Sequence, residues 1–121
     1  MGQPAQHHSI NYIEFSAAGV AKAKEFYNTV FGWKFQDYGP EYISFDKESA
    51  GIDGGFRLGA AAREPSGCGP LIVLYSSDLT ATQAAIEAAG GSIAVPTFEF
   101  PGGRRFHFAD PVGNVLAVWS E

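Results

Sequence analysis

The two halves of the sequence repeat one pattern of strands and helix, and this internal repeat restricts the possible folds more than any other feature. Each half opens on a short apolar strand, at residues 10–16 and 71–76, and continues with a helical stretch, at 19–31 and 78–89. Apolar residues recur along both helices at a spacing that buries one side. The matched positions are Val20, Ala23, Tyr27 and Val30, then Leu79, Thr82, Ile86 and Ala89. A glycine follows each helix and favours a left-handed cap there.

Three further strand segments follow each helix, so both halves have the order β-α-β-β-β. The segments are 34–38, 42–46 and 51–57, then 92–98, 104–109 and 115–120. We therefore predict an α+β fold with two tandem βαβββ modules that form an open, barrel-like curved mixed sheet with helices outside. The modules are residues 10–58 and 71–121 of one domain, 10–121, with a connector at 59–70 and a flexible tail at 1–9. A concave trough between the modules would suit a small molecule.

Charge and cysteine content narrow the classes of partner. The chain has 121 residues and a formal net charge of −5, which disfavours nucleic acid and anionic lipid as partners. No apolar run reaches the roughly 18 residues of a membrane-spanning helix, and we expect no membrane partner. The single cysteine, Cys68, cannot form an internal disulfide and is expected to be a free surface thiol. We expect a cytoplasmic protein.

Three stretches of the sequence resemble the vicinal oxygen chelate superfamily, which includes glyoxalase I, bleomycin- and fosfomycin-resistance proteins and extradiol dioxygenases. The stretches are Ile13-Glu14-Phe15, then Lys24-Glu25-Phe26-Tyr27 with Val30-Phe31-Gly32-Trp33, and Phe106-His107-Phe108-Ala109-Asp110-Pro111-Val112-Gly113-Asn114. The resemblance extends from Ile10 to Trp119. It implies paired βαβββ modules and a homodimer, and it leaves open whether modules pair within one chain or across the dimer.

Metal-using members of this superfamily place His or Glu at one inward position of the first and last strand in each module. Carried over by position, these ligands fall on Tyr12, Leu71 and Ala117 and near Gly55. Leucine, alanine and glycine side chains cannot bind a metal ion, and a neutral tyrosine is a poor ligand. We therefore expect no metal and no other cofactor.

Strand alternation sorts the residues that would line the trough from those behind it. The expected lining is mainly aromatic and apolar with a few polar groups: Tyr12, Glu14, Tyr42, Ser44, Arg57, Val73, Tyr75, Arg105, His107 and Trp119. Such a mixture is typical of a small-molecule pocket.

Several of these side chains have two interpretations. Glu14 is a candidate general base or an ion-pair partner of Arg57 or Arg105, and His107 is a candidate proton shuttle or a hydrogen-bonded wall residue. Arg105 suits a carboxylate, unless it pairs with Glu14 or lies at a rim. Trp119 and Tyr12 either stack on a planar ligand or pack at a dimer interface.

Three functions follow as hypotheses. The leading one is a metal-independent protein that binds a small organic molecule in the trough. The alternative is an enzyme, either a metal-dependent lyase or dioxygenase of the same superfamily, lactoylglutathione-lyase-like, or a metal-free acid–base catalyst that uses Glu14 and His107. The third is a structural or regulatory dimer with a filled trough. The sequence alone leaves open whether the protein is catalytic.

Overall fold

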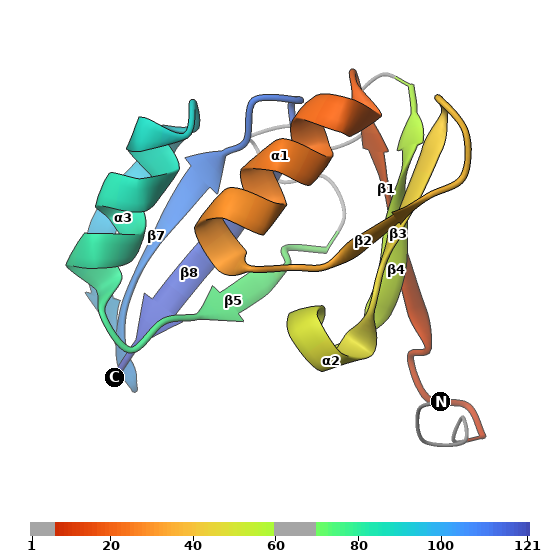
Figure 1. Ribbon diagram of the computed structural model, residues 1–121. Coiled ribbons are helices and arrows are strands. Elements are labelled where there is room, and N and C mark those ends of the chain that lie inside the picture. The colour runs from red at the N-terminus through yellow and green to blue at the C-terminus, as the bar shows by residue number, and fades with distance from the viewer. Residues whose placement is uncertain (1–6, 60–69) are drawn as a thin grey trace.

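The computed structural model describes residues 7–59 and 70–121, and its elements follow the repeat (Figure 1). They are β1 (Tyr12–Ala17), α1 (Val20–Phe31), β2 (Phe35–Asp37), β3 (Tyr42–Phe45), α2 (Lys47–Ala50), β4 (Asp53–Leu58), β5 (Val73–Tyr75), α3 (Leu79–Ala88), β6 (Ser92–Phe100), β7 (Gly103–Ala109) and β8 (Val115–Ser120). The predicted α+β fold with two βαβββ modules is confirmed. The single turn α2 was not expected; the Asp46 carboxylate caps it by accepting the Ser49 amide. No helix among these elements is long and apolar enough to cross a membrane.

Each module forms one mixed sheet with the same strand order. Sheet A has the order β1-β4-β3-β2, and sheet B has the order β5-β8-β7-β6. In both, the first strand runs parallel to the last, and the other neighbours are antiparallel. The connector and most of the predicted tail, residues 60–69 and 1–6 with Cys68 among them, lie outside the described residues.

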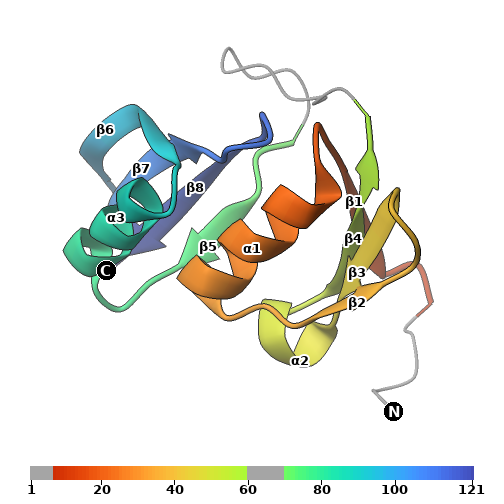
Figure 2. The same cartoon turned by 45° about the horizontal axis from the view of Figure 1, so that its top comes forward.

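The core is built around α1, which packs against both sheets. Tyr27 contacts Phe56 of sheet A with ring centroids 5.2 Å apart, while Phe26 contacts Phe108 of sheet B at 6.1 Å. All four rings are almost fully buried. The views of Figures 1 and 2 agree that α1 lies between the sheets, with α3 beside it over sheet B. Burial of these aromatic rings therefore joins the two modules in one hydrophobic core.

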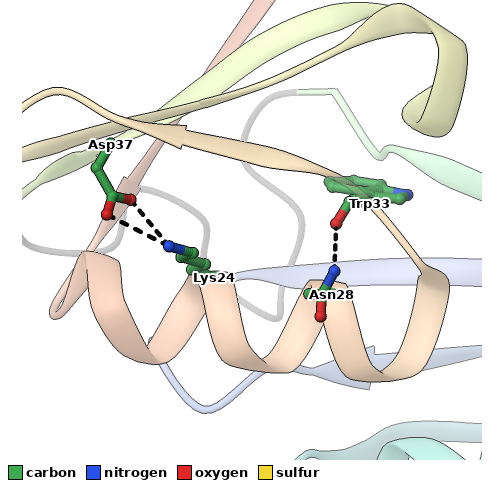
Figure 3. Close-up of polar contacts among 4 residues, drawn as sticks. All are labelled: Lys24, Asn28, Trp33 and Asp37. Atoms are coloured by element: carbon green, nitrogen blue, oxygen red, sulfur yellow. Dashed lines mark hydrogen bonds and ion pairs between the residues drawn. The ribbon is translucent and has the colours of Figure 1, made fainter.

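Polar and aromatic contacts connect α1 to the strand that follows it. Gly32 closes the helix in the left-handed conformation, and the Asn28 side chain donates to the Trp33 carbonyl over 2.9 Å. Further along, the Lys24 ammonium lies 3.1 Å from a carboxylate oxygen of Asp37 on β2 (Figure 3). The exposed ion pair adds little stability, so the buried Trp33 ring carries most of this contact.

The turn between β7 and β8 also holds the modules together. One carboxylate oxygen of buried Asp110 accepts the amides of Val112 and Asn114, over 3.0 and 2.8 Å. The other accepts the Tyr27 hydroxyl over 2.7 Å, and the Asn114 side chain donates to the Ser16 carbonyl over 2.9 Å. The Asp-Pro-x-Gly-Asn turn therefore also bonds module two to module one.

The placement of α1 decides where the expected trough can form. Among the described residues, the strands pair into two separate sheets rather than one curved sheet. Each sheet turns its Phe-rich face to α1, as Phe56 and Phe108 show. The opposite faces, which carry the predicted lining, point away from α1 and from each other. The sheets of one chain therefore do not enclose the trough between them.

Candidate functional site

The outer face of sheet A carries a connected set of polar side chains. Glu14 on β1 accepts the Tyr42 hydroxyl over 3.2 Å, and its other oxygen lies 3.3 Å from the Arg57 Nε. The Tyr42 hydroxyl also shares a hydrogen bond with the Tyr12 hydroxyl. Of the two partners expected for Glu14, the structure selects Arg57. We call Tyr12, Glu14, Tyr42, Ser44 and Arg57 the sheet-A outer face.

The Tyr42 hydroxyl is held in its protonated form. Partial burial raises the pKa of Tyr42, and the hydrogen bond to Tyr12 and the charge of Glu14 raise it further. Its ring lies over Gly55, where a Cβ atom would overlap the Tyr42 hydroxyl and would lie 2.6 Å from the Ile43 carbonyl oxygen. Gly55 therefore leaves the space that Tyr42 occupies.

The outer face of sheet B is aromatic and surrounds one cation. The Arg105 guanidinium carbon lies 5.2 Å from the centre of the Phe98 ring and 5.5 Å from that of Phe100. Trp119 contacts Tyr75 with centroids 5.2 Å apart, and it contacts Phe100 at 6.3 Å. We call Val73, Tyr75, Phe98, Phe100, Arg105, His107 and Trp119 the sheet-B outer face.

Sequence reasoning missed two members of this face, Phe98 and Phe100. No residue of the predicted segment 92–98 was assigned to a face, and β6 extends beyond that segment to Phe100. The strand changes register by one residue between Ile93 and Val95 and by one more before Phe98, so the two shifts together leave Phe98 on the side that alternation from Ser92 gives. After these shifts Phe98 pairs with Arg105, and the two phenylalanines share one side. Their spacing of two residues was the signal that could have placed them together.

The structure separates the predicted lining into two groups. Tyr12, Glu14 and Ser44 lie on one sheet, whereas Val73, Arg105 and His107 lie on the other. The hypothetical acid–base pair of Glu14 and His107 is therefore not assembled within one chain. The ring of His107 contacts Phe98 at a centroid distance of 5.9 Å. Two hollows, of about 450 and 410 Å³, lie beside α1 and are lined by other residues.

The residues at the metal positions of the fold do not fit a metal ion. In the structure Gly55 pairs with Glu14 on β1, and Ala117 pairs with Val73 on β5. Glu14 and Val73 are the next residues on the same face after Tyr12 and Leu71, the positions expected from the sequence. Even in this register Glu14 is the only side chain of the set with a good metal-binding oxygen. The described part of the chain brings no three His, Cys, Asp or Glu side chains together around a common point.

Comparisons with known proteins agree with this architecture. The family model described as "Glyoxalase/Bleomycin resistance protein/Dioxygenase superfamily" matches residues 9–118. Comparison with curated protein sequences finds no significant match.

Solved structures resemble the chain over most of its length. The E126Q mutant of the fosfomycin resistance protein FosX from Listeria monocytogenes has a TM-score of 0.77 at 17% identity, over 94% of this chain and 90% of that one. A glyoxalase-related enzyme from Fulvimarina pelagi has a TM-score of 0.73 at 21% identity, over 95% and 89%. TioX from Micromonospora sp. ML1 has a TM-score of 0.67 at 19% identity, over 93% and 98%. At such identities the likeness shows a shared fold.

Proposed function

The chain belongs to the glyoxalase/bleomycin resistance protein/dioxygenase superfamily, and we propose that it binds a small, partly planar organic molecule, without a metal ion, between two copies of itself. One observation carries this proposal. The two faces with the make-up of a ligand pocket both point outward from a single chain, so a second copy is needed to bring a sheet-A outer face opposite a sheet-B outer face.

Exposed apolar side chains support the pairing of two copies. Tyr12 is 46% exposed, Val73 is 41% exposed and Tyr75 is 54% exposed. Strands β1 and β5, which carry them, are edge strands of their sheets, and an uncovered edge can pair with another chain. A two-fold axis would repeat each contact and create two equal troughs. We infer a homodimer with one ligand site in each trough.

The two faces supply complementary chemistry to such a ligand. The sheet-B outer face offers rings for stacking, and the sheet-A outer face offers the Tyr12, Tyr42 and Arg57 side chains for hydrogen bonds. A structural relative, the FosX mutant from Listeria monocytogenes, is described as complexed with Mn(II) and 1S,2S-dihydroxypropylphosphonic acid. That protein thus holds a small molecule on the same fold, but the metal positions of this chain lack the ligands for the ion.

The hydrogen-bonded Tyr12, Tyr42 and Glu14 side chains favour acid–base catalysis as a second candidate function. In the proposed dimer the sheet-A outer face would lie opposite His107 of the second copy, so Glu14 and His107 would share a trough. Loss of turnover in both Glu14→Gln and His107→Ala, with ligand binding retained, would identify an enzyme.

A ligand screen tests the binding function. We expect some planar organic compounds to raise the melting temperature, because a ligand at about 100 times its Kd adds about 2.7 kcal/mol to the free energy of unfolding. Zinc, nickel and manganese salts alone should leave the melting temperature unchanged. Near-stoichiometric metal retained after dialysis would contradict metal-independent binding, and a diverse panel without any shift would contradict the binding function.

Mixed dimers test where the site lies. Ser44→Phe fills the sheet-A outer face, and Trp119→Ala removes a ring from the sheet-B outer face. Each variant homodimer should bind a compound found in the screen about tenfold more weakly. A mixed dimer, purified with two different tags, should regain one site of wild-type affinity, because sheet A of the Trp119→Ala copy faces sheet B of the Ser44→Phe copy.

Calorimetry measures the affinity and the number of sites in the mixed dimer. One tight site per dimer is the expected result. If each site lay within one chain, both sites of the mixed dimer would stay weak. A monomer in sedimentation equilibrium at micromolar concentration would contradict the proposed assembly directly.

A further inference from the structure

The guanidinium of Arg105 is enclosed by rings rather than by acids. Arg105 lies on β7 between Phe98 on β6 and Trp119 on β8, and it pairs with both residues across the sheet. Its charged carbon lies over the rings of Phe98 and Phe100, at 5.2 and 5.5 Å from their centres. Such cation–π contacts hold the side chain in place but leave its N–H groups unused.

The hydrogen bonds of Arg105 are incomplete. Its Nε atom is buried and has no hydrogen-bond partner among the described residues. The ion pairs of the described residues are formed by Lys24 and Arg57 instead. A buried donor of a cation without an acceptor costs free energy that an incoming acceptor would recover. The guanidinium fork matches the two oxygens of a carboxylate.

We propose that Arg105 binds the carboxylate of a planar aromatic acid, whose ring packs against the aromatic side chains around Trp119. This inference rests on the proposed function and names the ligand class of the same trough. The chain carries a net charge of −5, so general electrostatic attraction does not favour an anion. Recognition must come from a local cation, and the sheet-B outer face provides one beside several rings.

Three probe compounds distinguish the contribution of the ligand's charge from that of its aromatic rings. The probe is 2-naphthoate, compared with 2-naphthamide, which keeps the rings without the charge, and with cyclohexanecarboxylate, which keeps the charge without the rings. Calorimetry should give the tightest binding for 2-naphthoate, by about tenfold over either control. The chain has two tryptophans, and only the indole NMR signal of Trp119 should shift, since Trp33 is 5% exposed in the core.

Two arginine variants provide the matched control. Arg105→Gln removes the cation, whereas Arg104→Gln removes the neighbouring cation, which is exposed on the opposite side of β7. Arg105→Gln should weaken the binding of 2-naphthoate by about 10- to 100-fold and leave the affinity for 2-naphthamide unchanged. Arg104→Gln should leave both affinities unchanged. Arg105→Lys should recover only part of the loss, because an ammonium lacks the planar fork.

Equal affinity of 2-naphthoate and 2-naphthamide, or an Arg105→Gln variant that binds 2-naphthoate like the wild type, would overturn the role of Arg105 and leave the proposed trough intact. If the Arg105→Gln variant binds neither probe and its dimer dissociates, Arg105 belongs to the contact between the two copies, which also overturns the inference. Failure of both probes on a dimer that binds other screened compounds would overturn the ligand class alone.

Discussion

Replacing Asp110 with alanine should lower the free energy of unfolding by about 4 kcal/mol, measured by urea denaturation, because three buried donors lose their acceptor at about 1 to 3 kcal/mol each. The donors are the Tyr27 hydroxyl and the amides of Val112 and Asn114. Asp110 is 5% exposed and Tyr27 is fully buried, so these donors lie away from bulk water. This is a large part of the stability of a domain of this size.

The same substitution at an exposed carboxylate is the control. Asp37→Ala removes only the pairing with Lys24, whose side chain is 44% exposed, and should cost at most about 1 kcal/mol. Tyr27→Phe combined with Asp110→Ala should cost less than the two single changes added together, because both remove the same hydrogen bond. Additive effects, or an Asp110→Ala chain as stable as Asp37→Ala, would contradict the assigned role of the turn.

The stability should also depend on pH through this pair. Burial raises the pKa of Tyr27, and the charge of Asp110 raises it further; burial likewise raises the pKa of Asp110. The folded chain therefore holds each of these protons more tightly than the unfolded chain. Each bound proton contributes fully to the free energy of unfolding below the pKa that its group has in the unfolded chain. This contribution is lost as the pH rises, above about 4 for Asp110 and above about 10 for Tyr27. Tyr27→Phe should flatten the alkaline fall in stability.

Gly54→Ala should destabilise the protein by about 3 kcal/mol or more, or prevent folding, because β4 approaches its neighbours too closely for a side chain at this position. A Cβ atom there would overlap both the Ile13 carbonyl oxygen on β1 and the ring of Phe45 on β3. The Ile13 oxygen belongs to the backbone of the parallel pair and cannot move away alone. The strands that hold Glu14 and Ser44 would have to separate.

Another glycine of module one provides the comparison. Gly19 has an extended backbone, and the nearest atom to a Cβ there is the Lys22 Cβ at 4.0 Å. Gly19→Ser should keep or slightly raise the melting temperature, since serine can cap α1 where the structure has no side-chain cap. The melting temperatures of the Gly54→Ala and Gly19→Ser variants, measured by thermal unfolding, check both expectations. A Gly54→Ala protein within about 1 kcal/mol of the wild type would show that the strands adjust more easily than we infer.

Much of the fold could be predicted from the sequence because local periodicity carries the information. The predicted helices at 19–31 and 78–89 correspond to Val20–Phe31 and Leu79–Ala88, and the β-α-β-β-β order along both modules is confirmed. Alternation also separated the polar side of β1, with Glu14, from its Phe15 side. No face was assigned along the segment 92–98, which β6 extends to Phe100, so the two rings beside Arg105 were missed.

The sequence by itself determined the two modules and the face of most side chains, because both follow from the repeat of apolar residues along short segments. Only the tertiary structure decided which faces meet. Phe26 and Tyr27 are neighbours on α1, yet one packs on sheet B and the other on sheet A. Periodicity shows that such a helix has a broad buried side, but it does not identify the partner of each ring, because packing partners are chosen by shape across the whole core.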